Sequence, residues 1–362
     1  MTFFRKITSW IRFLLGEKNS PEERTKRRFV QLSEEETACR CRKLIRNSIA
    51  IRIGERVSSP LPVGASKFGG CPDLPEGTAW PVSEPCDAAE FRSEARGTLL
   101  AEALRQLGLP PEEPPKPGPM TLLAQINLAD VHPRDAEKEL PERGMLYFFY
   151  DPVPEVTWFS QSVGDGRPGI MKVLFEPGDV SGLKRMEWPT ALKEEFRFSE
   201  CPLTFKSEKM LPNDDDFSVY AMDSTDGNVR LAPPENYEEI VASLGIHSQT
   251  GRFEKHDRTG EPFLHLLGYA DLVQAPIAPE LEGTFHAAQK GIPMEAGTDW
   301  LLDGAAEWVL LFQFDSIYEE KITRRTGSEL CLDDAGRLFF YLRREDLKNR
   351  RFDRTLMVLQ CG

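Results

Sequence analysis

Residue types that could carry chemistry are concentrated in residues 66–75, which have the sequence SKFGGCPDLP and precede Trp80 and Pro81. Cys71 could be a nucleophile, because the nearby Lys67 would lower the pKa of its thiol. A single cysteine in a reduced protein is more often a small apolar filler. The prolines and the paired glycines exclude a helix or a regular strand. The stretch therefore predicts a rigid, shaped loop, and such loops either carry function or fix a fold.

Two apolar segments each carry a glutamine followed two residues later by another polar residue. They are residues 122–127 (LLAQIN) and 310–315 (LLFQFD). Side chains alternate along a strand, so these polar residues are predicted to share a face with the leucine before them. The two predicted sets are Leu123, Gln125 and Asn127, and Leu311, Gln313 and Asp315.

These polar strand residues have two interpretations. They could form the floor of a ligand pocket, with the 66–75 loop as its lid, because a pocket needs only a few convergent polar groups. They could instead bond to loop backbone, for example that of Gly69 and Gly70, as most buried polar side chains bond to backbone or water. The candidate ligand-binding residues are Ser66, Lys67, Gly69, Gly70, Gln125, Asn127, Gln313 and Asp315.

Motifs of several enzyme classes are missing from the chain. No G-x-S-x-G nucleophile elbow occurs, and no G-x-G-x-x-G motif follows a predicted strand. His247, His256 and His265 lie nine residues apart, which is not a metal-ligand spacing on any single element. The sequence identifies no catalytic residue, predicts no cofactor and no metal site, and leaves open whether the protein is an enzyme.

Each glutamine-bearing segment is followed by a second apolar segment that begins with glycine. Residues 144–150 (GMLYFFY) resemble residues 336–342 (GRLFFYL). Glycine permits the turn that joins two antiparallel strands. We therefore predict an α+β fold of mixed, mainly antiparallel sheets, built from two related β-pairs with peripheral helices. The two halves would span about residues 49–180 and 200–362.

Two segments are predicted to lie outside this repeat. Residues 1–30 form a basic segment before a main domain of residues 31–362, and residues 1–15 have the apolar spacing of a short amphipathic helix. Such a helix could dock on its own domain, fray, or lie on an anionic membrane surface. Residues 84–119 are predicted to be an insertion that ends in a stiff proline-rich linker.

Charge and cysteine content restrict the classes of partner and compartment. The formal net charge of -13 argues against a nucleic-acid binder, which would need a basic footprint, and suits a basic partner. The seven cysteines are an odd number, and no secretory signal precedes them, so we predict free thiols in the cytoplasm. No apolar run approaches the length of a membrane span.

The order of these motifs resembles the bacterial YwqG-like family, a domain of unknown function, from about residue 49 to the end of the chain. The resemblance implies an α+β fold in the bacterial cytoplasm and supplies no catalytic residues. Relatives are associated with toxin–immunity gene clusters, which makes a protein-binding role plausible by analogy. The segments that carry the resemblance are residues 66–75, 80–81, 123–128, 140–150, 267–269, Gln274, 308–315, 334–341 and 359–361.

The leading hypothesis from the sequence is a cytoplasmic, non-enzymatic module that binds a basic protein partner, with a link to toxin–immunity systems. The alternative is a small-molecule binding protein or enzyme with its site between the two β halves. Contact of the N-terminal helix with a membrane surface is a third and weaker hypothesis.

Overall fold

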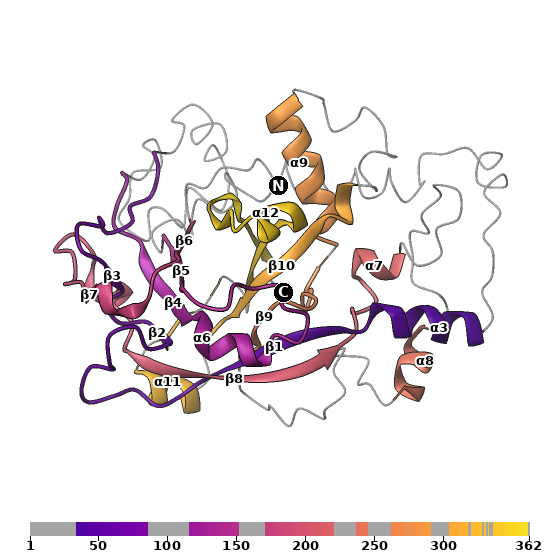
Figure 1. The fold of residues 1–362 in the computed structure, drawn as a ribbon, viewed down its shortest axis with the longest axis horizontal. Helices are drawn as coiled ribbons and strands as arrows, with labels where there is room; N and C mark the ends of the chain where they lie inside the picture. Colours follow the sequence, from indigo (N-terminus) through magenta and orange to yellow (C-terminus); the bar gives the residue numbers. More distant parts are fainter. Residues whose placement is uncertain are drawn as a thin grey trace, which may run out of the picture.

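The computed structural model of the chain describes residues 34–85, 116–151, 171–220, 237–244, 262–274, 276–290, 304–317, 320–327, 329–330, 332 and 336–360 (Figure 1). The predicted helix of residues 1–15, most of the 84–119 insertion, and His247 and His256 lie outside the described residues. What the sequence suggests for these parts stays a prediction.

In the described part of the chain, ten strands form one large sheet with the order β12-β11-β10-β9-β1-β8-β2-β4-β5-β6, and its neighbouring strands are antiparallel. A separate antiparallel pair is formed by β3 and β7. The strands are β1 (Arg46–Ile53), β2 (Lys67–Phe68), β3 (Asp73–Pro75), β4 (Thr121–Asn127), β5 (Met145–Tyr150), β6 (Met171–Glu176), β7 (Leu183–Arg185), β8 (Cys201–Met210), β9 (Leu264–Leu266), β10 (Trp308–Asp315), β11 (Arg337–Arg343) and β12 (Leu356–Gln360).

Helices lie around this sheet, and Figure 1 shows α3, α7 and α8 together at the end opposite β3 and β7. The α-helices are α3 (Glu34–Leu44), α6 (Leu128–Val131), α7 (Phe217–Tyr220), α8 (Tyr237–Ser243), α9 (Ala278–Lys290), α11 (Glu320–Thr326) and α12 (Arg344–Lys348). The 3-10 helices are η1 (His132–Arg134), η4 (Val180–Gly182), η5 (Glu194–Phe196) and η7 (Phe352–Arg354). Among the described residues, no helix combines the length and the apolar character needed to cross a membrane.

The predicted α+β class with antiparallel strands is confirmed, although strands dominate the fold. The two predicted β-pairs correspond to β4–β5 and β10–β11. They belong to one continuous sheet rather than to separate sheets, because β2, β8, β1 and β9 connect them.

Strict alternation of side chains fails at one leucine in each of β4 and β10. Strand pairing shifts register across Leu123 in β4 and across Leu311 in β10. Each shift adds one residue to one strand, which breaks the two-residue period. Both leucines consequently pack in the central core. The prediction that they share a face with Gln125 and Gln313 is therefore wrong.

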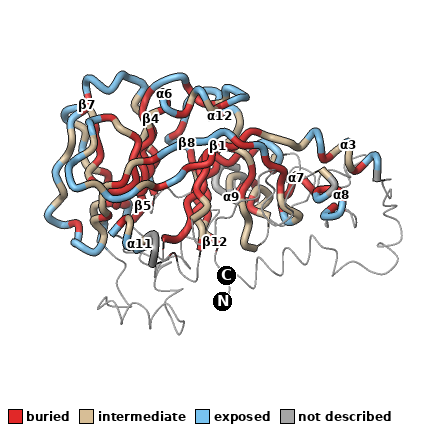
Figure 2. The backbone as a smooth tube through the Cα atoms, turned by 90° about the horizontal axis from the view of Figure 1, so that it is seen from below, coloured by how far each residue is buried: buried red, intermediate tan, exposed pale blue. Residues whose placement is uncertain are grey.

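Apolar side chains from both halves of the chain form a central core. Figure 2 colours the strands that carry them largely as buried. The rings of Phe148 and Phe312 have centroids 4.4 Å apart, and those of Phe68 and Phe314 are 5.9 Å apart. This central core includes Ile49, Ile51, Ile53, Phe68, Leu123, Ala124, Ile126, Leu146, Phe148, Leu264, Leu266, Leu311, Phe312, Phe314, Leu338 and Phe340.

Candidate functional site

The stretch of residues 66–75 is a loop only in part, because Lys67–Phe68 forms β2 and Asp73–Pro75 forms β3, so the exclusion of a strand was wrong for these residues. The remaining residues 69–72 join the two strands, and two glycines set the shape of this loop. Gly69 and Gly70 have φ of +60° and +71°, a region that side chains disfavour. A β-carbon on Gly69 would lie 2.5 Å from the carbonyl oxygen of Ser199. The amide of Gly69 donates to the carbonyl of Leu123, and that of Gly70 donates to the carbonyl of Phe198. These amides therefore attach the loop to the sheet and are not directed at a ligand.

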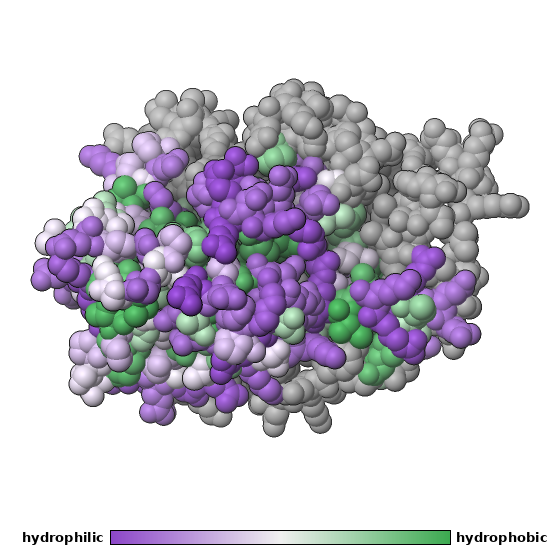
Figure 3. Space-filling view, in the orientation of Figure 1, coloured by the Kyte–Doolittle hydropathy of each residue, from purple (hydrophilic) through white to green (hydrophobic). Residues whose placement is uncertain are grey.

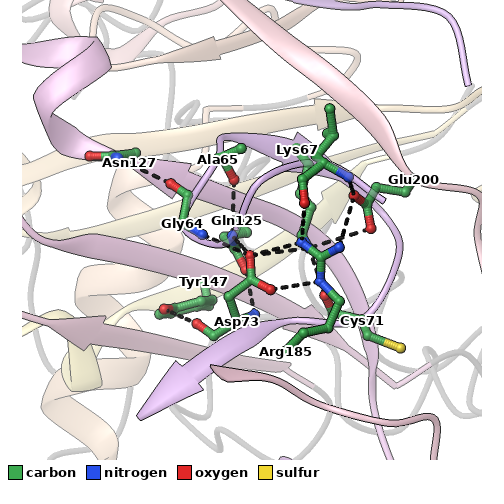
Figure 4. A network of polar contacts seen from close by, with 11 residues as sticks. Gly64, Ala65, Lys67, Cys71, Asp73, Gln125, Asn127, Tyr147, Arg185 and Glu200 are labelled. Atoms are coloured by element: carbon green, nitrogen blue, oxygen red, sulfur yellow. Dashed lines mark hydrogen bonds and ion pairs between the residues drawn. The ribbon is translucent and has the colours of Figure 1, made fainter. Parts of the chain in front are cut away.

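Lys67 is completely buried beneath this loop. Its Nζ donates to the carbonyl of Cys71 at 2.7 Å and lies 3.4 Å from Asp73 Oδ2 and 3.5 Å from Glu200 Oε2 (Figure 4). Burial lowers the pKa of Lys67, while the charges of Asp73 and Glu200 oppose that shift. Three acceptors around one ammonium group make a structural ion cluster.

Asp73 is the centre of the cluster and is also fully buried. Arg185 Nε donates to Asp73 Oδ1 at 2.8 Å, and Arg185 Nη1 lies 3.4 Å from Glu200 Oε1. Burial raises the pKa of Asp73, but hydrogen bonds from Arg185 and Gln125 and the charge of Lys67 outweigh burial and hold it below its ordinary value. Asp73 is therefore a carboxylate in the folded protein.

Gln125 completes the attachment of the loop to the sheet. Its Nε2 donates to the carbonyl of Ala65 at 2.9 Å and to Asp73 Oδ2 at 2.8 Å. Its Oε1 accepts the amide of Asp73 at 2.7 Å. Tyr147 adds a hydrogen bond to the carbonyl of Asp73. We call Lys67, Asp73 and Gln125 the first loop pin. The bonds of Gln125 match the structural alternative considered for it.

The remaining candidates of the first half also bond within the protein. Asn127 Nδ2 donates to the carbonyl of Gly64 at 3.0 Å, and its Oδ1 accepts the amide of Ala129 as the N-cap of α6. Ser66 Oγ donates to Asp130 Oδ2 at 2.8 Å and accepts the amide of Asn127. Both residues thus hold the segment that precedes Lys67 against the end of β4.

A corresponding arrangement occurs in the second half of the chain. Gln313 Nε2 donates to the carbonyl of Phe263 at 3.0 Å and to Asp271 Oδ2 at 2.8 Å, and its Oε1 accepts the amide of Asp271. Buried His265 places Nε2 3.5 Å from Asp271 Oδ2. We call His265, Asp271 and Gln313 the second loop pin. Gly268, with φ of +76°, lies between its histidine and its aspartate, as Gly70 lies in the first loop.

Asp315, the last candidate, lies at the end of β10 and is 8% exposed. It accepts the amide of Phe263 at 2.9 Å and lies 3.2 Å from Arg337 Nε. Burial raises the pKa of Asp315, and the charge and hydrogen bond of Arg337 act in the opposite direction. Its contacts therefore help to hold the segment that enters β9.

The structure does not bring the candidates of the two halves into one site. Gln125 lies opposite Tyr147 in the β4–β5 register, and Gln313 lies opposite Phe339 in the β10–β11 register. Residues opposite each other in a ladder share a face. Tyr147 and Phe339 belong to two different apolar clusters, neither of which is the central core. The predicted pocket floor is thus divided between two separate apolar clusters outside the central core.

Cys71 does not have the properties of an activated thiol. Burial raises its pKa to about 11, outweighing the opposite effect of Lys67 and Arg185. A thiol with such a pKa is almost entirely protonated at neutral pH, and the thiolate is the nucleophilic form. This favours the structural interpretation of Cys71.

Sequence reasoning missed Asp73, Asp271 and His265 as members of these clusters. The signal that could have found them is a shared spacing: a basic residue, then glycine three positions later and Asp-Leu six and seven positions later. It occurs as KFGGCPDL from Lys67 and as HLLGYADL from His265. Arg185 and Glu200 gave no such signal, because their partners are distant in sequence.

A comparison with protein families matches residues 66–361 to a family described as a domain of unknown function (DUF1963). The chain belongs to this family. The matched residues include both loop pins and exclude β1. No curated protein matches the chain significantly. The DUF1963 family brings no functional residues with it, so the function has to be argued from the site itself.

Proposed function

We propose that this chain is a non-enzymatic protein-interaction module that binds a basic partner protein. One observation carries the proposal: the charged groups of the first loop pin are buried and paired with each other and with Arg185. Buried charges that are paired with each other in this way hold the loop in one conformation. A rigid loop loses little entropy when its outer surface binds a partner. This supports recognition rather than catalysis.

The outer surface next to the first loop pin exposes two valines. Val63 is 43% exposed and Val180 is 39% exposed. They lie close together, because a β-carbon on Gly64 would be 2.5 Å from Val180 Cγ1. Gly64 is itself tied to the pin, since its amide donates to Asp73 Oδ2 at 3.0 Å. An apolar pair on a fixed support favours a protein contact.

Negative charge accompanies the two exposed valines. The chain carries a net charge of -13, and the exposed Asp179 lies directly beside Val180. Complementary charge increases the rate and the specificity of association. A basic partner is therefore favoured, and a toxin neutralised by this protein is one such partner that the family resemblance suggests.

The alternative of a small-molecule or enzyme site between the two halves has less support. The described interior between β4–β5 and β10–β11 is filled by the central core, including the rings of Phe148 and Phe312. Gln125 and Gln313 donate their amides to their own loops. These contacts leave the predicted polar floor without a shared pocket.

The test is a pull-down with the tagged full chain under native conditions, with mass spectrometry of proteins and small molecules. We expect a stoichiometric basic protein whose retention falls with added salt. A V63D/V180D variant should lose this protein. V82D is the matched control and should keep it, because Val82 is also exposed, at 54%, but lies elsewhere, in an isolated β-bridge with Pro119. Retention by V63D/V180D would reject this surface. A retained metabolite without any protein would reject the interaction role.

We also infer that the two halves derive from a duplicated β unit. The bulges at Leu123 and Leu311 and the equivalent bonds of Gln125 and Gln313 support this inference. Equivalent pins should have similar effects on stability, so Q125L and Q313L should lower the free energy of unfolding by similar amounts. If urea titration showed a large loss for only one of them, the equivalence would not hold.

A further inference from the structure

A cavity of about 330 Å³ lies where β11 continues into α12 and η7, away from both loop pins. Its volume is at the lower end of the range for small-molecule sites. It is lined by Phe285, Arg343, Glu345, Asp346, Asn349, Arg351 and Arg354. The proposed protein contact does not involve these residues, and the family match covers them without giving them a role.

The segment that borders this cavity is basic although the protein is acidic. Residues 343–354 contain six arginines and lysines against three acidic residues, in a chain with a net charge of -13. Figure 3 shows hydrophilic surface gathered over α12 in this view. The cavity lining itself has three arginines against Glu345 and Asp346, so it keeps a positive excess that favours an anionic ligand.

Ion pairs fix the orientation of the arginines at the cavity. Arg351 forms a bidentate pair with Asp353 at 3.1 and 3.0 Å, and Arg354 Nη1 bonds Asp346 Oδ1 at 3.2 Å. A guanidinium group has five N–H donors, so one carboxylate does not exhaust it. Arg351 is 48% exposed and Arg354 is 52% exposed, which makes both accessible to a ligand from solvent.

The third arginine connects the charged cavity to an aromatic surface. Arg343 lies over the ring of Phe285 at 4.8 Å and pairs with the buried Glu282. Its guanidinium is therefore held in place by a carboxylate and a ring. Phe285 also lines the cavity and offers an apolar face beside the arginines.

The backbone between α12 and η7 is strained. Arg350 has φ of +59°, at a helix end where glycine or asparagine is usual. The turn is fixed by the amide of Arg350, which donates to the carbonyl of Leu347, and by that of Arg351, which donates to the carbonyl of Asp346. It lets α12 and η7 border the same cavity. These two bonds are those of a Schellman helix end, which accounts for the positive φ of Arg350.

We propose that this cavity binds a small phosphorylated molecule, with its phosphate on Arg351 and Arg354 and its apolar part against Phe285. A phosphate suits several arginine donors better than a single carboxylate does, because it offers more acceptor oxygens and more charge. In this structure Asp353 and Asp346 occupy these arginines, so a phosphate has to compete with both carboxylates.

Isothermal titration calorimetry of the full chain at low ionic strength tests the proposal, with adenosine monophosphate and inorganic phosphate as probes. We expect adenosine monophosphate to bind one site and inorganic phosphate to compete for it. R351Q/R354Q should weaken binding at least tenfold. D353N should strengthen it several-fold, because it releases Arg351 from a competing carboxylate.

The matched controls are R143Q and E142Q, exposed charge changes in the turn before β5. Both should bind like the wild type. Absence of binding at millimolar probe, or equal losses in R351Q/R354Q and R143Q, would overturn the proposal. Circular dichroism checks folding of each variant. If R351Q/R354Q does not fold, the D353N variant tests the proposal in its place, because it keeps every arginine. Unchanged or weaker probe binding by D353N would overturn the proposal.

Discussion

Replacing Asp73 by asparagine should strongly destabilise the protein. The substitution preserves shape but removes the carboxylate that accepts from Arg185, Gln125 and Gly64 and faces the ammonium of Lys67. Removing one partner of a buried ion pair costs about 3–5 kcal/mol, because the other charge stays buried, and Lys67 would keep only Glu200 Oε2, at 3.5 Å, as a charged partner. We therefore expect D73N to lower the free energy of unfolding by about 3–5 kcal/mol.

Lys67→Met provides the matched comparison. It removes the other charge of the same pair, but Asp73 keeps Arg185 as a partner at 2.8 Å. The substitution also removes the cost of burying an ammonium group. K67M also loses the hydrogen bond from Lys67 to the carbonyl of Cys71. That carbonyl is then left as a part-buried acceptor without this partner, which costs about 1–3 kcal/mol. K67M should therefore destabilise the protein less than D73N.

The stability that Asp73 contributes should also depend on pH. The folded pKa of Asp73 lies below its ordinary value of 3.8, so the unfolded chain binds this proton first as the pH falls. The contribution of Asp73 is complete above 3.8 and is lost as the pH falls through 3.8 towards the folded pKa. D73N should therefore flatten the acid side of the stability profile.

Urea titration followed by tryptophan fluorescence measures these differences at pH 7 and on the acid side. The reasoning would be refuted if the free energy of unfolding of D73N lay within about 1 kcal/mol of the wild-type value, which is the size of one ordinary hydrogen bond. A K67M variant that is less stable than D73N would refute it as well. Either result would mean that the cluster is solvated or loosely held and does not pin the loop.

Four further predictions test other parts of the structure. G70A should cost more stability in urea titration than G77A, because both positions have positive φ but only at Gly70 would a β-carbon meet Glu200, at 2.7 Å; equal losses would contradict the close packing. Cys71 should react with iodoacetamide more slowly than a free thiol at pH 8, and faster as the pH rises towards its pKa of about 11; rapid labelling at neutral pH would contradict its burial. A fragment of residues 66–361 should show no cooperative urea transition, since it lacks β1 from the middle of the sheet. Deleting residues 1–16 should not change co-sedimentation with anionic liposomes if the N-terminal helix docks or frays, and a loss of binding would support the membrane hypothesis.

The strands were predictable because their signal is local. Residues 122–127 and 310–315 are apolar segments of strand length, and they form most of β4 and β10. The glycine-rich loop was also predictable, since Gly69 and Gly70 adopt the positive φ that their type permits. The structural interpretation of Gln125 followed from the general need of buried amides for partners.

The remaining features depend on information that a strand pattern lacks. A β-bulge at Leu123 changes the face of that residue without changing its type, so alternation alone could not place it. The partners of Asp73 include Arg185, which is 112 residues away and is brought near by the pairing of β3 with β7. Such a contact is determined by topology. The loop pins were therefore visible only in part, as unexplained glutamines.

The strand order also explains why the two halves form one unit. β1 precedes the first loop pin in sequence, yet it pairs with β9, the strand that carries His265 of the second pin. β8, which enters the second half, pairs with β2, the strand that carries Lys67. Each of these two strands thus pairs with a strand of the other predicted half, and β1 and β8 pair with each other at the centre. Separating the halves would break this centre and expose both pins, so rigidity of the first loop depends on the whole sheet.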